Sequence, residues 1–185
     1  MHTVRDGRGV NLTDPRLRLA AVVAFVVVVF DQLTKAIVVM TIPLHTQIDL
    51  TSFLALTYVR NRGAAFSALA DAPSTLRVPL FLGVTVLAVG VLLSYLRETP
   101  PERRGLIAAF GAILGGAIGN LICRIRAGEV IDFLLLHWHD WQWPVFNVAD
   151  SAITVGVAVL LLQSLRRSDR TDFTRSAEPD TNLGR

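Results

Sequence analysis

Apolar residues along the chain gather in four long blocks, and polar segments separate them. The blocks cover about residues 17–40, 76–96, 105–122 and 148–165. A helix needs about 20 predominantly apolar residues to cross a bilayer, and each block approaches or exceeds that length. The pattern therefore predicts four transmembrane helices.

The third block differs from the others because it is rich in small residues. It contains the sequence GAILGGAIGN. Small side chains let membrane helices approach closely, so we expect this helix at the centre of the bundle.

Residues 41–75 contain alternating apolar and polar positions, as in IDLTSFLALTYV. Such alternation is typical of a strand with one buried face, and we expect a small β-element outside the membrane here. The sequence NRGAAFS follows at Asn61–Ser67. Gly63 permits close backbone approach and Asn61 both donates and accepts hydrogen bonds, but spacing alone favours an ordinary turn.

The composition indicates a membrane protein and not a soluble fold with a large core. Of the 185 residues, 52% are hydrophobic and 18% are charged, and the mean hydropathy is +0.49. Soluble domains carry about 25% charged residues. The net charge of +3 does not indicate a nucleic-acid partner, because the basic residues flank the apolar blocks and form no helical stripe. The single cysteine, Cys123, excludes an internal disulfide and a multi-cysteine metal site.

Arginine-rich segments predict the orientation of the four spans. They are the tail of residues 1–16, the loop 97–104 and the tail 166–185, which we expect to be disordered. Because cytoplasmic flanks carry more Lys and Arg, these segments are expected in the cytoplasm, which places residues 41–75 and 124–147 outside. Polar residues from all parts of the chain then meet near the outer interface. They are Asp31, Lys35, Asn61, Asn120, Asp132 and Asp150.

Asp31 and Lys35 interrupt the first block within the sequence DQLTK. Because they are four residues apart on a helix, they share a face and can form an ion pair. One interpretation is a structural pair near the membrane surface, with Lys35 extending its ammonium group towards water. The other is that one of the two residues lines a polar site between helices.

Asp132 and Asp150 both lie beside strongly apolar sequence, where an ionised group is costly and usually functional. Asn147 and Asp150 have the spacing of a helix capping box, which would account for Asp150 alone, whereas Asp132 has no such explanation. If the two carboxylates meet, they cannot both ionise cheaply, so they would share a proton as an aspartic protease dyad does. We expect Asp150, at a helix start, to be the ionised partner and Asp132 to hold the proton, an assignment that separate titration of the two Asp→Asn variants would test.

The sequence HWHD at His137–Asp140 raises the alternative of a metal site. Its spacing matches no common ligand pattern, and Trp138, Trp141 and Trp143 surround it. Tryptophans so close together are typical of an anchor at the membrane interface. We therefore expect neither a metal nor another cofactor.

Four motifs together resemble those of the bacterial lipoprotein signal peptidases, also called signal peptidase II. They are DQLTK at 31–35, NRGAAFS at 61–67, GGAIGNLICR at 115–124 followed by GEVIDF, and FNVADSAITVG at 146–156. The resemblance covers about residues 19–165 and implies a membrane all-α bundle of four transmembrane helices. It also implies a small extracytoplasmic β-cradle at 41–75 and a lid segment at 124–147 with a short periplasmic helix or loop.

In this family, the aspartates that match Asp132 and Asp150 form the catalytic dyad. The implied substrates are prolipoproteins whose lipobox cysteine already carries diacylglycerol, and cleavage falls just before that cysteine. The implied location is the bacterial inner membrane with both termini cytoplasmic, and we expect a monomer that contacts membrane lipid. The residues implied to bind substrate or support the dyad are Asn61, Gly63, Asn120, Arg124 and Asn147.

The chain departs from the family at Cys123, because an aspartate usually precedes the arginine that matches Arg124. A thiol cannot serve as an anionic partner for Arg124 unless it ionises, so we expect Arg124 to be less well oriented. Replacing Cys123 by Asp should therefore keep or raise the rate of prolipoprotein cleavage in a reconstituted assay. A clear loss of rate would show instead that the site has adapted to cysteine.

Two other functions fit parts of the pattern. A small membrane transporter subunit would use intramembrane Asp and Lys as an ion relay, but it predicts polar residues through the full membrane depth. A catalytically impaired homologue fits the departure at Cys123, although Asp132 and Asp150 are both retained.

Overall fold

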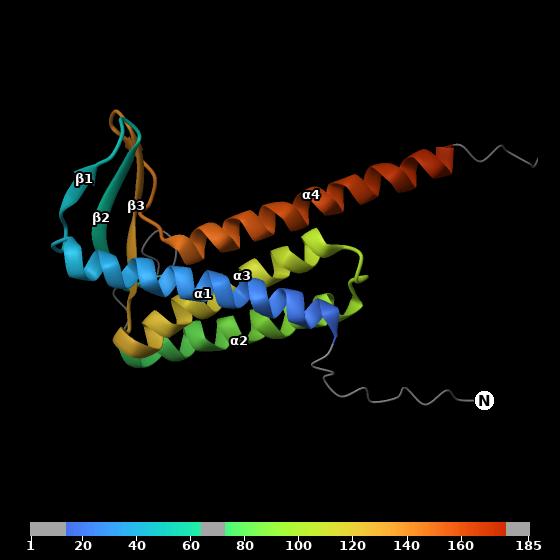
Figure 1. Cartoon of the computed structure of the whole chain (residues 1–185), viewed down its shortest axis with the longest axis horizontal. Coiled ribbons are helices and arrows are strands. Elements are labelled where there is room, and N and C mark those ends of the chain that lie inside the picture. The colour runs from blue at the N-terminus through green and yellow to red at the C-terminus, as the bar shows by residue number, and fades with distance from the viewer. Residues whose placement is uncertain (1–13, 64–72, 177–185) are drawn as a thin grey trace, which may run out of the picture.

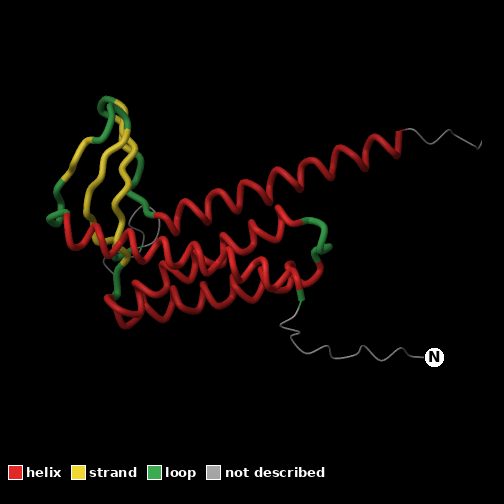
Figure 2. The backbone as a smooth tube through the Cα atoms, in the orientation of Figure 1, coloured by secondary structure: helices red, strands yellow, loops and turns green. Residues whose placement is uncertain are grey.

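Long helices form the body of the molecule, and a small sheet extends from one end of it (Figures 1 and 2). The computed structural model describes residues 14–63 and 73–176, so parts of the predicted tails and residues 64–67 of the NRGAAFS motif lie outside the described residues. The helices are α1 (Pro15–Thr41), α2 (Ser74–Glu98), α3 (Arg104–Ala127) and α4 (Val148–Ser176). Each contains a stretch long and apolar enough to cross a membrane. The prediction of four such helices is confirmed for the described residues.

Helix α3 lies against α1 on one side and α4 on the other, and its glycines make this close packing possible. A Cβ atom added to Gly115 would lie 2.7 Å from the backbone oxygen of Ala24 on α1. Gly116 lies against Ala149 of α4 in the same way. The prediction that the small-residue helix is central is therefore confirmed, and α3 can place polar side chains against both neighbours.

Replacing Gly115 by Ala should destabilise the protein by about 1–3 kcal/mol, because the new methyl group would meet backbone atoms that cannot move aside. A matched control is Gly83→Ala on α2, where an added Cβ meets nothing within 4 Å. This control should be neutral or slightly stabilising, since Ala is the better helix former. Equilibrium unfolding of both variants in micelles tests the difference, and equal stability would contradict the proposed packing.

The sheet is formed by two segments that are far apart in the sequence. Its strands lie antiparallel in the order β1-β2-β3-β4. They are β1 (Gln47–Asp49), β2 (Leu54–Asn61), β3 (Val130–Trp138) and β4 (Trp141–Gln142). Pairing of Val59 with Asp132 and of Asn61 with Val130 brings the end of β2 beside the start of β3. The β-element predicted within 41–75 is present, but the other strands come from the segment expected to form a lid.

The segment 124–147, which was predicted to be a lid with a short helix or loop, contains two strands as well as a loop. Helix α3 continues to Ala127 and ends at Gly128, whose φ of 70° is the left-handed conformation that terminates many helices. Strands β3 and β4 and their connections form the rest of the segment. The run VIDFLLLHW is apolar at most positions, so periodicity alone could not identify it as a strand.

Helix α4 also extends further than predicted. Disorder was expected from residue 166, but the helix continues to Ser176. No Gly or Pro lies between Val157 and Ser176, so nothing in the sequence interrupts the helical hydrogen bonds where the apolar block ends.

Candidate active site

A cavity of about 250 Å³ lies where β2, β3, the end of α3 and the start of α4 meet. Its apolar wall comes from Val130 and residues 143–146. Polar side chains from every one of these elements open into it, namely Asn61, Asn120, Arg124, Asp132 and Asp150. The structure thus brings both candidate carboxylates to one cavity, at the end of the bundle that carries the sheet.

Asp132 lies near the start of β3 and is only 2% exposed. The Asn61 side chain donates to its Oδ2 at 2.9 Å, and the Asn147 side chain donates to its Oδ1 at 2.6 Å. Burial raises the pKa of Asp132 to about 6, and the charge of Asp150 acts in the same direction, whereas the two amide hydrogen bonds oppose the increase. Asp132 therefore holds a proton more tightly than an exposed aspartate does.

Asp150 lies in the first turn of α4 and forms the predicted capping box with Asn147. The Asn147 backbone N–H donates to Asp150 Oδ2 at 3.2 Å, and the Asp150 N–H donates to Asn147 Oδ1 at 2.9 Å. The prediction that Asp150 and Asn147 form a capping box is confirmed. The capping box involves only one of the two Asp150 carboxylate oxygens, however. Asp150 Oδ1 accepts a hydrogen bond of 2.7 Å from Asn120 and lines the cavity.

Two asparagines connect the carboxylates. Asn147 bonds to both of them, through its side chain to Asp132 and through its backbone to Asp150. Asn120 donates to Asp150 and accepts a hydrogen bond of 3.1 Å from the Asn147 side chain. Among the described residues, neither carboxylate forms an ion pair, so neutral amides position them without fixing their charge.

Asp31 and Lys35 of α1 form a buried ion pair that contacts Asn120. Their side chains are 0% and 2% exposed, and Lys35 Nζ lies 2.9 Å from Asp31 Oδ2. Lys35 Nζ also donates to Asn120 Oδ1 at 2.9 Å, and Asp31 Oδ1 accepts the Ala149 N–H of α4 at 3.0 Å. The interpretation that Lys35 extends towards water is wrong, because the start of α4 and Asn120 hold the pair inside the protein.

Arg124 and Cys123 are neighbours on α3 but line different cavities. The Arg124 guanidinium lies 4.5 Å from the centroid of the Phe81 ring on α2 and reaches the cavity of Asp132. The Cys123 thiol is buried and lies 3.7 Å from Gln32 Nε2. Phe81 therefore orients Arg124, a contact that sequence reasoning missed because the two residues lie on different helices.

The backbone of Gly63 holds the side chain of Asn61, which lines the cavity. Its N–H donates to Asn61 Oδ1 at 2.9 Å, which turns the Asn61 amide group towards Asp132. The role of this asparagine was expected only from the family resemblance. The structural reason is a turn at the end of β2 that presents Asn61 to β3.

The apolar wall lies within the segment 124–147 that was expected to cover the site, but its individual residues were not predicted. Phe146 pairs with β3, because its N–H donates to Leu134 O at 3.0 Å and its carbonyl accepts from Phe133 N and Leu134 N. Trp143 was interpreted as a membrane anchor, yet it lines the cavity. Among the described residues, no group of three His, Cys, Asp or Glu side chains is placed to hold a metal ion.

Comparisons of the sequence and the fold relate this chain to known proteins. A family model described as signal peptidase (SPase) II matches residues 23–166. A lipoprotein signal peptidase of Syntrophotalea carbinolica is 47% identical over 152 residues, which cover 82% of this chain and 93% of the relative. A second, from Geobacter sulfurreducens, is 45% identical over 157 residues, which cover 84% and 97%. A solved structure described as a bacterial membrane enzyme has a TM-score of 0.75 and 28% identity, and the match covers 83% of this chain and 92% of that one. The chain therefore belongs to the signal peptidase II family.

Proposed function

We propose that this protein is an intramembrane aspartic endopeptidase that removes the signal peptide from diacylglyceryl-modified prolipoproteins, just before the lipidated cysteine. The observation that carries the proposal is the position of Asn147, which bonds to both Asp132 and Asp150. The names of its relatives, lipoprotein signal peptidases, support the class of substrate.

In the proposed reaction, a water molecule between the carboxylates attacks the scissile carbonyl carbon. Ionised Asp150 takes a proton from this water, and protonated Asp132 donates its proton to the carbonyl oxygen. The C–N bond then breaks, and the leaving amine takes the proton from Asp150. The hydroxyl group of the intermediate returns a proton to Asp132 as the carboxyl product forms, so the pair ends as it began.

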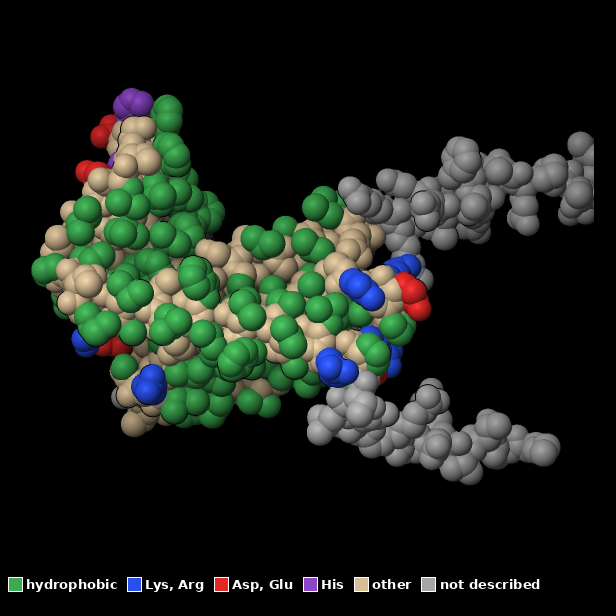
Figure 3. Space-filling model, viewed as in Figure 1, with side chains coloured by type: hydrophobic (Ala, Val, Ile, Leu, Met, Phe, Trp, Pro, Cys, Tyr) green, Lys and Arg blue, Asp and Glu red, His purple; other side chains and the backbone are tan. Residues whose placement is uncertain are grey.

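The apolar helices suit a substrate whose acyl chains stay in a bilayer. Hydrophobic side chains cover most of the visible face of the helices. Lys and Arg side chains lie at both ends of it, and more of them are visible at the end away from the sheet (Figure 3). Exposed arginines at that end are Arg18, Arg97, Arg103 and Arg104. Because cytoplasmic flanks are rich in arginine, the sheet and the cavity would face the opposite side of the bacterial inner membrane.

The depth of the polar residues favours this function over a transporter subunit. Among the described residues, the buried charged and amide side chains are Asp31, Lys35, Asn120, Asp132 and Asn147. They belong to one hydrogen-bonded network beside the sheet and do not continue along the helices. An ion relay across the membrane would require such groups at other depths as well.

Reconstitution with a purified prolipoprotein tests the proposed function. We expect the protein to release the signal peptide from the diacylglyceryl-modified precursor and to leave a precursor with Ala in place of the lipobox cysteine intact. Mass spectrometry of the products identifies the cleaved bond. An inert protein would support a catalytically impaired homologue, and cleavage elsewhere would contradict the assigned substrate.

The pH dependence of cleavage tests the protonated state of Asp132. Since its pKa is about 6, kcat/KM should fall as the pH rises through that value and the pair loses its shared proton. Replacing Asn61 by Leu removes a hydrogen bond that favours the ionised form, so the alkaline fall in kcat/KM should move to higher pH.

The control for this experiment is Gln47→Leu, an exposed change on β1 that should leave the profile in place. A shift of the Asn61→Leu profile to lower pH would contradict the assignment of the proton to Asp132.

A further inference from the structure

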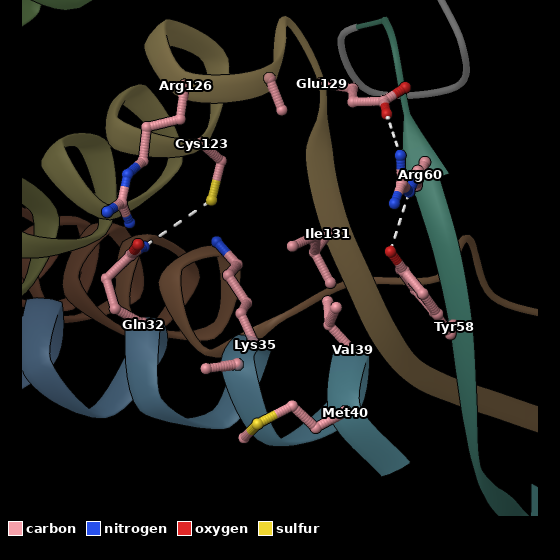
Figure 4. Close-up of a pocket in the computed structure, with 12 residues that line it drawn as sticks. Gln32, Lys35, Val39, Met40, Tyr58, Arg60, Cys123, Arg126, Glu129 and Ile131 are labelled. Carbon is pink, nitrogen blue, oxygen red and sulfur yellow. Dashed lines mark hydrogen bonds and ion pairs between the residues drawn. The ribbon is translucent and has the colours of Figure 1, made fainter. Parts of the chain in front are cut away.

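A second cavity, of about 350 Å³, lies between the end of α1, the end of α3 and the β2–β3 pair (Figure 4). Along β2 and β3 its lining residues alternate with those of the candidate active site. Tyr58, Arg60 and Ile131 face the second cavity, whereas Asn61 and Asp132 face the first. Successive side chains of a strand point to opposite faces, so the two cavities lie on opposite sides of this ladder.

The second cavity has an excess of positive charge. Figure 4 shows Arg126 of α3 and Arg60 of β2 on opposite sides of it. Glu129 is shared by Arg60 at 3.1 Å and Arg62 at 3.3 Å, so one carboxylate faces two guanidinium groups. Arg126 forms no ion pair with the described residues. The charge of Lys35, whose side chain also lines the cavity, is already matched by Asp31.

An apolar surface continues from the cavity along α1. It is formed by Ala36, Val39 and Met40, of which Val39 is 42% and Met40 is 75% exposed. These residues belong to the last turns of a helix that is apolar enough to cross a membrane. A cationic rim at the end of such a helix, with an apolar wall leading from it, suits a molecule with an anionic head and a hydrocarbon chain.

The geometry points to a binding site for an anionic phospholipid, with Arg126 and Arg60 as ligands of its phosphate and the Val39–Met40 surface in contact with an acyl chain. Guanidinium groups bind phosphate oxygens through paired N–H donors. Arg60 Nε already donates to the Tyr58 hydroxyl at 2.8 Å, which fixes the direction of its guanidinium. The Val39–Met40 surface favours a lipid over free phosphate, because a free phosphate ion has no hydrocarbon chain to contact it. Occupation of this site does not depend on peptidase activity.

Lipid retention by the purified full-length protein tests the site. The protein is prepared in detergent with equal amounts of phosphatidylglycerol and phosphatidylcholine, and bound lipid is counted by native mass spectrometry. We expect phosphatidylglycerol to be retained in preference, and Arg126→Gln to weaken its binding by about tenfold, as loss of a hydrogen bond to a charged group does. The matched control is Arg103→Gln, which removes an exposed arginine at the opposite end of the helices. Equal retention by the two variants, or no preference between the lipids, would overturn the proposal.

Two further experiments distinguish specific binding of a lipid at this cavity from general electrostatic attraction between the protein and anionic lipid. Cys123 lines the cavity, so Cys123→Asp would place a carboxylate beside the phosphate and should weaken phosphatidylglycerol binding, whereas Cys123→Ser should retain it. Equal binding by these two variants would contradict the assigned position of the phosphate.

Glycerol 3-phosphate at millimolar concentration should not displace the lipid. Displacement would show that the cavity recognises the phosphate alone. Thermal unfolding of every variant confirms that each is folded.

Discussion

Replacement of Asp132 by Asn should reduce kcat for prolipoprotein cleavage by about 10²–10⁴-fold, with a much smaller change in KM. An amide cannot donate and recover the proton that the carbonyl oxygen needs, although its size matches the carboxyl group. Asp132 also accepts hydrogen bonds on both oxygens, from Asn61 and Asn147, so one of these donors would face an amide N–H in the variant. Steady-state kinetics with a lipidated precursor in micelles measure both constants.

Replacement of Asp150 by Asn should cause a loss of the same order, because the attacking water would have no base. The fold should survive, since the amide oxygen can still accept the Asn147 N–H at the start of α4. Asp49→Asn is the matched control, because the Asp49 side chain is 64% exposed on β1 and pairs with Ala55, at the opposite end of β2 from Asn61. Wild-type turnover by either dyad variant would show that the assignment of the catalytic pair is wrong.

The helices and the close packing of α3 could be predicted from the sequence because they depend on local patterns. Block length is enough to identify a membrane-capable helix, and a cluster of glycines such as Gly115 and Gly116 is enough to predict close contact. The capping box of Asn147 and Asp150 was predictable for the same reason, since its partners are three residues apart.

Strand β3 and the contacts it makes could not be predicted from local patterns. Its apolar run reads equally well as a buried strand or part of a helix, and its partner β2 lies about 70 residues earlier in the chain. The hydrogen bond from Asn61 to Asp132 depends on this pairing, and so does the separation of the two cavities. The contact of Asp132 with the rest of the site was therefore an inference from the predicted topology and the family resemblance, and the strand register supplies its structural reason.

One of the two interpretations of Lys35, in which its ammonium group extends towards water, was wrong for a different reason. A lysine near the end of an apolar block usually extends towards water, and nothing within the sequence DQLTK indicates otherwise. Its burial depends on Asn120 of α3, which accepts a hydrogen bond from it, and on the start of α4, which closes over Asp31. These partners come from distant parts of the chain, so only the packed structure shows that the pair supports the candidate active site.

Replacement of Lys35 by Met should lower the free energy of unfolding by about 3–5 kcal/mol, because it leaves the buried Asp31 carboxylate without its cation. Asp31 would keep hydrogen bonds from Gln32 and the Ala149 N–H, but neither neutralises its charge. Asn120 would lose one donor as well, so catalytic activity should fall together with stability. Equilibrium unfolding in micelles measures the loss, and Arg18→Met, an exposed change on the same helix, should stay within about 0.5 kcal/mol of wild type.

The double variant Asp31→Asn with Lys35→Met separates the cost of the unpaired charge from the cost of the lost packing. It buries no charge, and the Asn oxygen can still accept the Ala149 N–H, so it should be more stable than Lys35→Met alone. If the double variant were no more stable than Lys35→Met alone, Lys35 would stabilise the protein mainly through its contact with Asn120 and not through its charge. If Lys35→Met were as stable as wild type, the ion pair would contribute nothing to the stability of the fold, and the prediction would be wrong.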